Sequence, residues 1–475
     1  MLGMRTLRNV LAAILVLSPP PTSAAGLDWP RVADEALQRL QLYLRVDTTN
    51  PPGHETPAVE LLRDWLDAEG IETHLYDALH DPQRQALVAR LPGGGGEAGG
   101  ARTLVLMSHS DVVPAIAADW SHQPFAAEIV DGTLYGRGVL DTKGLGILEL
   151  TTLVLLKRQG LTPRDEILLL IEPDEEEGSR GIQGVLAQHD DLFRHVHMVL
   201  NEGGSGTRDL LKQGQLIFFV QTAEKGKAWM KVSARGDTGH ASVPLPNNAV
   251  VTMVRALDRI AQYQTPLHPS PAVVQLFGDL AEQLPFPESL IMGHVDSPIV
   301  QTLFRRQLTQ RPPINALLRT TISLTGVHGG YKTNVIPAQV DATLDCRVNV
   351  GDSGEALQRE LTHVVDDPRV SIELGEGSTT SNESPVDETL MATIRNVTQG
   401  RFPGSIVAPL LTSGVTDSAY FRRRNIPAYG FNPIVVSEAE LESEHGIDER
   451  ASVAAFRDAV QTYYEVVSRL AGVGP

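Results

Sequence analysis

Short apolar runs alternate with a longer helical pattern between about residues 101 and 200. Uninterrupted apolar runs at 103–107 (TLVLM), 166–171 (EILLLI) and 197–200 (HMVL) are typical of strands buried on both faces of a sheet. Between the first two runs, residues 144–159 have the length and composition of a helix, which Gly160 ends. The order strand, helix, strand predicts an α/β fold: a mixed, mostly parallel sheet flanked by helices.

The pattern changes near residue 222. Residues 228–234 (AWMKVSA) alternate like a half-exposed strand, 247–263 form an amphipathic helical pattern, and alternating strands return at 320–325 and 340–348. A proline-rich stretch with short helical patterns fills 265–313. We therefore predict a main domain made of residues 26–222 and 351–475, interrupted by an inserted α+β domain at 223–350 with an antiparallel sheet.

The first 25 residues have the pattern of an export signal. Arg5 and Arg8 precede an apolar run at 10–17, and three prolines and a small-residue stretch, 22–25 (TSAA), follow it. The apolar run is about half of the ~20 residues that a membrane-spanning helix needs, so a membrane anchor is the weaker interpretation. We expect residues 1–25 to be a cleaved signal peptide, the protein to be secreted or periplasmic, and no stable membrane anchor to remain.

Charge and cysteine content narrow the classes of partner and metal site. Cleavage would remove two basic residues and no acidic one, which takes the formal charge from −18 to −20. Nucleic acid is therefore an unfavourable partner. Cys346 is the only cysteine, which excludes an intrachain disulfide and Cys-rich zinc sites. Any metal must be held by His and carboxylates, and the basic run 422–424 is expected to end a helix in solvent.

Candidate chemistry follows the predicted strands, where open α/β sheets place their ligand sites. His109 and Asp111 follow the first strand in an H-x-D spacing that lets a carboxylate orient a metal-binding imidazole. Taken alone, a surface His beside an Asp is the better interpretation. Asp141 precedes the predicted helix in a glycine-rich turn, where it could bridge two cations or simply cap the helix.

Three further segments carry acidic or imidazole groups. Asp174 to Glu177 form a run of four acids directly after a buried strand, and such a run needs a cation to offset its mutual repulsion. Glu202 follows the next apolar strand, and His445 lies far along the chain in the segment 444–449 (EHGIDE). Each segment alone is a modest signal, but the five together are a strong one.

The motifs HxDVVP, GRGxxDxKG and DEExG, in this order, resemble the aminoacylase and carboxypeptidase family of two-zinc metallopeptidases. That family includes glutamate carboxypeptidase, acetylornithine deacetylase, succinyl-diaminopimelate desuccinylase and yeast carboxypeptidase S. The resemblance covers residues 33–470 and implies the following metal ligands: His109 and Glu202 for one ion, Glu176 and His445 for the other, and Asp141 as the bridge. It also implies Glu175 as general base and acid, Asp111 as the partner of His109, and a cis peptide after Asp141.

The resemblance extends to the inserted domain, which it implies is a lid or dimerisation domain. His240 lies in a G-x-x-x-H-x-S-x-P segment whose His stabilises the oxyanion; without the resemblance, a turn His beside the following helix is an equal alternative. Asn334 (NVIP), Arg347 (DxR) and Gly414 (GxTD) are implied to bind substrate, with Arg347 as a clamp for a free carboxylate. The long stretch at 268–313 leaves open whether His240 acts within its own chain or from the second copy of a homodimer.

These residues favour a hydrolase that cleaves a peptide or N-acyl amide bond next to a free α-carboxylate. The expected substrates are small peptides or N-acyl amino acids, as for carboxypeptidases and aminoacylases. The expected cofactor is two zinc ions per chain, with cobalt or manganese as alternatives, because His and carboxylate sites accept several divalent ions. An exported dipeptidase is the alternative enzyme, and a catalytically silent peptide-binding protein is disfavoured because Glu175 is present.

Overall fold

The structure is a computed structural model that describes residues 26–95 and 102–473; the predicted signal peptide lies outside the described residues. Its helices are α2 (Trp29–Leu44), α3 (Thr56–Ala68), α4 (Lys143–Arg158), α5 (Arg180–Gln188), α6 (Ala249–Gln262), α7 (Pro271–Ala281), α8 (Glu288–Met292), α9 (Pro298–Leu303), α10 (Arg305–Thr309), α11 (Pro312–Leu318), α12 (Gly354–Val365), α13 (Glu388–Arg401), α14 (Ser418–Arg422), α15 (Glu438–Leu441) and α16 (Val453–Leu470). Short 3-10 helices lie at Ala117–Asp119 and Asp190–Phe193.

Its strands are β1 (Glu72–Tyr76), β2 (Ala86–Leu91), β3 (Thr103–His109), β4 (Glu128–Val130), β5 (Thr133–Tyr135), β6 (Glu166–Glu172), β7 (Val196–Arg208), β8 (Leu216–Glu224), β9 (Gly226–Arg235), β10 (Gly239–His240), β11 (Thr321–Gly329), β12 (Val335–Ile336), β13 (Gln339–Val348), β14 (Val370–Leu374), β15 (Asn382–Glu383), β16 (Ile406–Thr412), β17 (Ala428–Val436) and β18 (Arg450–Ser452). A nine-stranded sheet forms the main domain, in the order β1-β2-β6-β3-β7-β17-β8-β15 with β16 beside β8. The central neighbours β6, β3, β7 and β17 are parallel. Strands β1, β2 and β15 pair in antiparallel fashion, whereas β16 is parallel to β8. The predicted mixed α/β sheet is therefore present.

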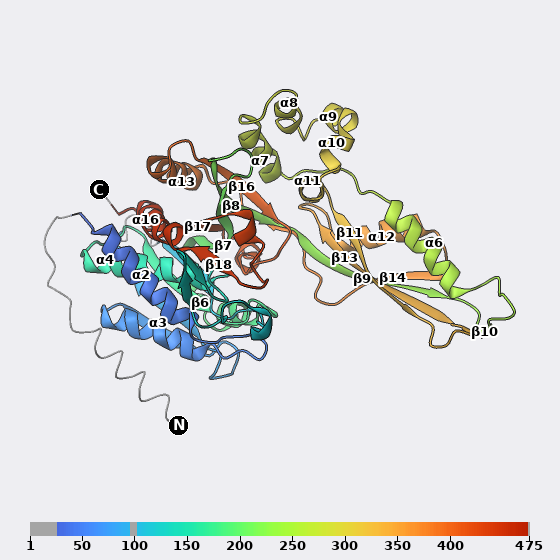
Figure 1. The fold of residues 1–475 in the computed structure, drawn as a ribbon, viewed down its shortest axis with the longest axis horizontal. Coiled ribbons are helices and arrows are strands. Elements are labelled where there is room, and N and C mark those ends of the chain that lie inside the picture. The colour runs from blue at the N-terminus through green and yellow to red at the C-terminus, as the bar shows by residue number, and fades with distance from the viewer. Residues whose placement is uncertain (1–25, 96–101, 474–475) are drawn as a thin grey trace.

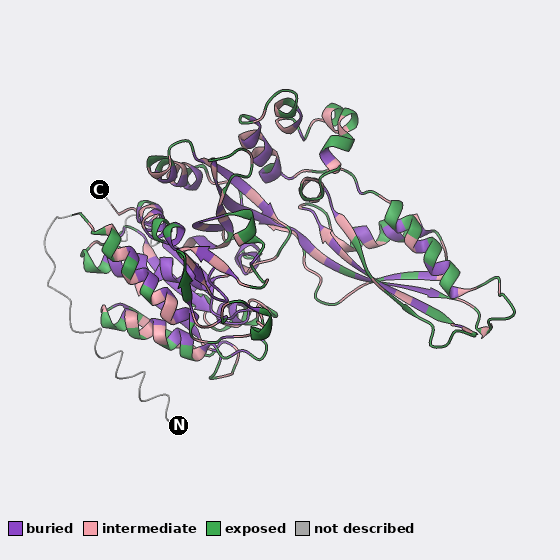
Figure 2. Cartoon of the chain, viewed as in Figure 1, coloured by how far each residue is buried: buried purple, intermediate pink, exposed green. Residues whose placement is uncertain are grey.

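Alternate residues of the central strands pack into different cores. On β3, Leu104 and Leu106 join the core under α2, α3, α4 and α16, whereas Val105 and Met107 join the core under α5 and α14. A strand covered by helices on both faces needs apolar side chains at every position, which is why this sequence is uninterrupted. Figure 2 shows these central strands as buried.

The inserted domain is a second lobe that projects from the main sheet (Figure 1). Its four-stranded antiparallel sheet has the order β11-β13-β9-β14, and α6 and α12 cover one face of it through a separate apolar core. The boundary predicted at residue 351 differs from this arrangement, because β14 pairs with β9 and α12 packs in the same core. The inserted domain therefore extends to about Leu374.

The proline-rich stretch belongs to the main domain in space. Val273 and Phe277 of α7 pack with Ala223 and Leu411, which lie at the β8 and β16 edge of the main sheet. Helices α7 to α11 thus cover an edge of the main domain (Figure 1), whereas the sequence pattern assigns them to the inserted domain. Amphipathic periodicity identifies a face that must be buried but not the surface that buries it.

The two domains join where β8 continues into β9 through the single residue Lys225. The side chain of Arg422 lies at this junction, where its Nη1 is 3.1 Å from Glu224 Oε1 and the pair is almost fully buried. The expectation that the basic run 422–424 lies in solvent is therefore wrong for Arg422, because a long-range carboxylate compensates its charge. Across residues 26–95 and 102–473, no helix has the length and apolarity that crossing a membrane requires.

Candidate metal centre

Two parallel strands end at the candidate site, and a third passes through it. His109 is the last residue of β3, Glu175 and Glu176 follow β6, and Glu202 lies on β7. Because β6 and β3 are parallel neighbours, their carboxyl ends lie at one edge of the sheet, and β7 beside β3 brings Glu202 there. The fold thereby brings together four side chains that are up to 93 residues apart in the chain.

Asp141 reaches the same edge from the turn before α4. The peptide bond between Asp141 and Thr142 is cis, as the resemblance implies. The residue at the N-cap of α4 is Thr142 and not Asp141. The Thr142 side chain makes no capping hydrogen bond. The buried carboxylate of Glu449 accepts hydrogen bonds from the backbone N–H groups of Gly138 and Leu140 at 2.8 Å, and it pairs with Arg137 at 2.7 Å. Glu449 therefore holds the turn that presents Asp141.

The Asp141 carboxylate lies between two His–Glu pairs. On one side, His109 Nε2 is 2.9 Å from Asp141 Oδ1 and 3.4 Å from Glu202 Oε2. On the other side, His445 Nε2 is 2.7 Å from Asp141 Oδ2 and 3.3 Å from Glu176 Oε2. Each oxygen of one carboxylate therefore faces a separate imidazole and carboxylate, which is the arrangement of a bridging ligand between two cations.

Glu175 lies beside this cluster. Its carboxylate, a His109 nitrogen and a Glu202 oxygen all lie within 4.8 Å of one another. Burial raises the pKa of Glu175 well above its usual value, and the negative charge of Glu202 adds to this effect. A carboxylate with a raised pKa next to the metal ligands is suited to accept and return a proton.

Asp111 organises the site through both its backbone and its side chain. The His109 ring contacts Asp111 through Nδ1, which lies 3.0 Å from the Asp111 backbone oxygen, and this leaves Nε2 for a metal. The Asp111 carboxylate accepts the backbone N–H groups of Glu175 at 3.1 Å and Glu176 at 3.2 Å. Asn50 Nδ2 donates to the same carboxylate at 2.8 Å. The acidic run is therefore fixed by Asp111 as well as by β6.

The electrostatics of the cluster fit a cation. Burial raises the pKa of Glu202 to about 8, and the hydrogen bonds to Asp141 and Glu176 raise the pKa of His445 to about 11. Although burial raises the pKa of Asp141, its hydrogen bonds with His109 and His445 lower it overall. Glu176 Oε1 is buried without a hydrogen-bond partner among the described residues. Crowded carboxylates and an unpartnered buried oxygen are the features that divalent ions satisfy.

The predicted substrate residues fall into two groups. Arg347 and Gly414 lie near the domain junction, where Arg347 Nη1 donates to the backbone oxygen of Ser413 at 3.0 Å. His240 and Asn334 lie at the far tip of the inserted domain, where β10 pairs with β12 (Figure 1). His240 is exposed, and its Nδ1 contacts Ser242 Oγ at 2.6 Å. The chain therefore does not bring His240 or Asn334 to its own metal cluster.

Arg347 already holds a carboxylate of its own chain. Its Nε and Nη2 donate to Asp345 at 2.9 and 3.2 Å, so the edge suited to a substrate carboxylate is occupied by this Asp. To bind a substrate carboxylate with these two nitrogens, Arg347 would have to release the Asp345 carboxylate. The DxR pattern alone does not reveal this requirement.

Sequence reasoning missed the residues that support the site from a distance. Asn50 donates to both Asp111 and Asp174, and Arg84 lies 2.8 Å from Asp174. Glu449 lies within the acidic segment that drew attention to His445, but nothing in its local pattern distinguishes it from a surface acid. The burial of these polar side chains would have identified them, but burial is known only once the fold is known.

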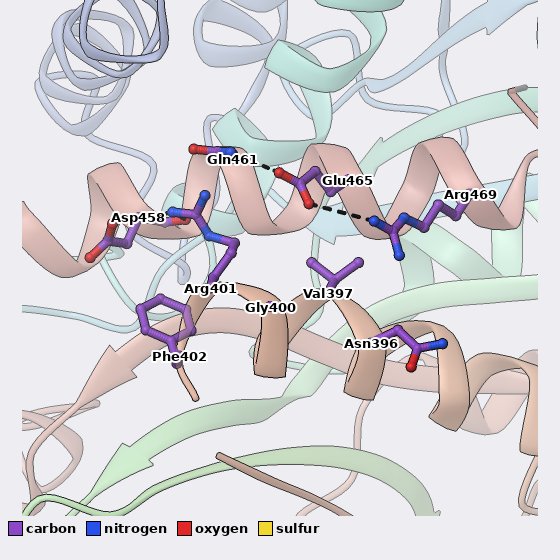
Figure 3. A pocket seen from close by; sticks show the side chains of 9 residues that line it. All are labelled: Asn396, Val397, Gly400, Arg401, Phe402, Asp458, Gln461, Glu465 and Arg469. Atoms are coloured by element: carbon purple, nitrogen blue, oxygen red, sulfur yellow. Dashed lines mark hydrogen bonds and ion pairs between the residues drawn. The ribbon is translucent and has the colours of Figure 1, made fainter. Parts of the chain in front are cut away.

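A surface pocket of about 480 Å³ lies apart from this cluster, between α13 and α16 (Figure 3). Arg401 of α13 and Asp458, Gln461 and Glu465 of α16 are among the residues that line it. Its two arginines have acidic neighbours: Arg401 is 3.3 Å from Asp458 and Arg469 is 3.9 Å from Glu465. None of the predicted site residues lines this pocket.

The fold and the cluster define a hydrolase of the metallopeptidase class. More narrowly, the chain belongs to peptidase family M20/M25/M40, whose model matches residues 105–469. The N-fatty-acyl-amino acid synthase/hydrolase PM20D1 of Xenopus tropicalis is 31% identical over 374 residues, which cover 76% of this chain and 71% of that protein.

Two solved structures show the same fold. The M20 family metallo-carboxypeptidase Sso-CP2 of Sulfolobus solfataricus has a TM-score of 0.65 at 17% identity, and the match covers 92% of this chain and 99% of that one. The Bacillus subtilis YXEP protein, described as a dinuclear metal binding peptidase, has a TM-score of 0.59 at 13% identity, with 94% and 99% covered.

Proposed function

We propose that this protein is a two-metal N-acyl amino acid hydrolase that cleaves the amide bond next to a free α-carboxylate. The observation that carries the proposal is the position of Asp141, whose two oxygens face the His109–Glu202 and His445–Glu176 pairs. The acyl amino acid substrate is supported by the PM20D1 relative, whose name describes that activity. A carboxypeptidase acts on the same chemical unit, because its scissile amide also carries a C-terminal carboxylate.

The five ligands would hold two divalent ions, with zinc as the expected metal. When bound, such ions polarise the amide carbonyl and lower the pKa of a shared water toward ~7. Glu175 would accept the proton of that water and deliver it to the leaving nitrogen, because its carboxylate lies within 4.8 Å of His109 and Glu202. The family resemblance assigns the five ligand positions to other residues. Asp111 and Asn50 keep the Glu175 backbone in place during this transfer.

The test is a substrate series with the metal-loaded protein. The series comprises an N-acyl amino acid, the same compound with its carboxylate amidated, and a dipeptide of matched size, each compared by kcat/KM. We expect the free acid to exceed the amidated compound by at least about tenfold, because a charged hydrogen bond contributes roughly 1.5–3 kcal/mol. Chelation should abolish activity, and zinc, cobalt or manganese should restore it. Equal rates for acid and amide, or full activity after chelation, would contradict the proposal.

We also propose that His240 acts from a second copy of the chain. The exposed tip that carries His240 lies far from the metal cluster of its own chain (Figure 1), so a homodimer through the inserted domain would have to supply it. The oxyanion that forms during amide hydrolysis needs a donor of this kind.

Export remains a proposal that rests on residues 1–25. Their basic start, short apolar run and small residues support a cleaved signal peptide and a secreted or periplasmic location. N-terminal sequencing of the protein recovered outside the cytoplasm should start near Gly26; recovery of the uncleaved chain in the cytoplasm would contradict it.

A further inference from the structure

The open face of the inserted sheet carries charged side chains where the sheet meets the main domain. Strands β9 and β13 pair so that Lys227 lies opposite Arg347 and Trp229 lies opposite Asp345. Side chains directly opposite each other on antiparallel strands lie on the same face of the sheet. The alternate residues of β9, such as Ala228, pack in the core under α6 and α12. Two basic residues, one acid and one aromatic ring are therefore neighbours on the face that these helices leave open.

This cluster is accessible and lies next to the loop that leads to the metal centre. The side chains of Arg347 and Asp345 are 31% and 29% exposed. Arg347 also donates Nη1 to the backbone oxygen of Ser413 at 3.0 Å. Four residues further along, Asp417 lies near the metal cluster: burial raises the pKa of Glu175, and the negative charge of Asp417 adds to this effect. A ligand at the metal centre could therefore reach Arg347 along this loop.

The cluster has more positive than negative charge. Arg347 donates Nε and Nη2 to the Asp345 carboxylate at 2.9 and 3.2 Å. Lys227 has no carboxylate within 4.0 Å in the part of the chain that the structure describes. By contrast, Lys231 on the same strand pairs with Asp341 at 3.3 Å. Lys227 and Arg347 thus have one acid between them, and a second carboxylate would balance their charge.

Asp345 contacts donors on two sides. Its Oδ2 accepts Arg347 Nη2 at 3.2 Å and Trp229 Nε1 at 3.4 Å. The Trp229 residue is 45% exposed, and Lys227 Nζ lies 4.2 Å from the centre of its ring. The indole N–H and the nearby ammonium are therefore available to the Asp345 carboxylate when Arg347 pairs with another acid.

We propose that Asp345 occupies Arg347 until the free carboxylate of the substrate replaces it, after which Lys227 and Trp229 hold Asp345. The exchange replaces one charged two-point pair with another. An amidated substrate has no charge to offset the lost ion pair, so it leaves Asp345 in place and binds without Arg347. Asp345 is thereby a specificity-determining residue. This inference rests on the proposed function, because it concerns the carboxylate of the same substrate.

Calorimetric titration of zinc-loaded Glu175→Gln protein tests the proposal, because this variant should bind a substrate without hydrolysing it. The probes are N-butanoyl-leucine and its carboxamide. Adding Asp345→Asn should tighten binding of the acid by about 5–10-fold, since a neutral amide holds Arg347 about half as strongly as a carboxylate does. Binding of the carboxamide should change by less than about twofold. Asp341→Asn, on the same strand and face, is the matched control and should leave the binding of both probes unchanged.

The receiving side of the exchange has its own variant. Lys227→Met should weaken binding of the acid by about two- to fivefold, as partly exposed charge pairs allow. Lys231→Met is the control on the same strand. The loss caused by Lys227→Met should be smaller when Asp345→Asn is also present, because no released charge then has to be held. An equal loss in both backgrounds would overturn the proposal.

The direction of the Asp345→Asn effect is the decisive result. Weaker binding of the acid would show that Asp345 orients Arg347 and does not compete with the substrate. Equal tightening of the acid and the carboxamide would also overturn the proposal. If Asp345→Asn does not fold, Asp345→Ser replaces it in every comparison, because it also removes the charge. A wild-type protein that hydrolyses neither probe would contradict the proposed function instead, and the binding comparison would still decide the exchange.

Discussion

The carboxyl edge of the main sheet and the tip of the inserted domain differ in how completely they are assembled. At the sheet edge, side chains from distant segments contact one another at 2.7–3.4 Å, and further buried groups hold each of them. At the tip, His240 is exposed, and the hydrogen bonds of its side chain go to Ser242 two residues away. The metal centre is therefore preorganised within one chain, whereas the tip can contribute chemistry only after a second surface is brought to it.

The sheet edge should show the largest effect, and it separates two adjacent glutamates. Glu175→Gln keeps the size of the side chain but removes its ability to accept a proton, so we expect a loss of ~10²–10⁴-fold or more in kcat with two metals retained. Glu176→Gln should lose metal as well as rate, because its carboxylate faces His445. Elemental analysis together with single-turnover rates measures both. Near-native turnover in Glu175→Gln, or a lost metal in that variant, would show that these roles are assigned wrongly.

Mixing two inactive variants would show whether the tip acts from a second copy. Removing an oxyanion donor costs about 10²–10³-fold, so His240→Ala should be nearly inactive, as should Glu175→Gln. In a mixed dimer, the subunit with an intact Glu175 receives His240 from the other subunit. We expect co-refolded equal amounts to regain about a quarter of wild-type activity, because half of the dimers have one working site. His240→Ala mixed with itself is the control, and no recovery in the mixture would exclude action between copies.

The meeting of three candidate ligands could be predicted because neighbouring parallel strands bring them to one edge of the sheet. His109 ends β3, Glu176 follows β6 and Glu202 lies on β7. The ligand roles of Asp141 and His445 follow only from the family resemblance. Supporting residues could not be predicted in this way. Asn50 and Glu449 act through contacts 61 and 309 residues away along the chain, and their local sequence gives no sign of burial.

The inserted domain was less predictable for a related reason. Its strand and helix patterns are correct in kind, but periodicity does not say which surface an apolar face will cover. The sequence patterns of α12 and β14 therefore look like the second part of the main domain. In the structure, β14 joins the sheet of the inserted domain and α12 packs in its core. Helix α7 shows the opposite case, since Val273 and Phe277 cover the main sheet. The place of His240 depends on these long-range choices.

Arg347 lies between the metal cluster and the tip of the inserted domain. We expect its substitution to lower activity less than the changes above and only for some substrates. Arg347→Ala should lower kcat/KM for free-acid substrates by about 10–100-fold and leave amidated substrates little changed. Arg369→Ala is a matched control, because Arg369 pairs with Asp367 two residues before it as Arg347 pairs with Asp345. Equal losses on acid and amide substrates would show that Arg347 supports the junction and does not bind the carboxylate.

The smallest expected effect concerns the stability of the main domain beneath the metal centre. Glu149 lies fully buried on α4, where its Oε2 accepts a hydrogen bond from Ser108 at 2.8 Å, and burial raises its pKa well above the usual value. The folded state therefore keeps Glu149 protonated where the unfolded chain has already ionised it. Its contribution is most favourable below the unfolded pKa near 4.5 and is lost as pH rises toward the folded pKa. Glu149→Gln remains neutral and escapes this loss, so its stability relative to wild type should increase from pH 5 to 8, by about 1.4 kcal/mol for each pH unit over which only the folded state keeps Glu149 protonated. Thermal unfolding of both proteins at matched metal content across this range measures the difference. A difference that does not change with pH would show that Glu149 is already ionised in the folded core, where Ser108, Tyr463 and the Met107 backbone hydrogen-bond to it.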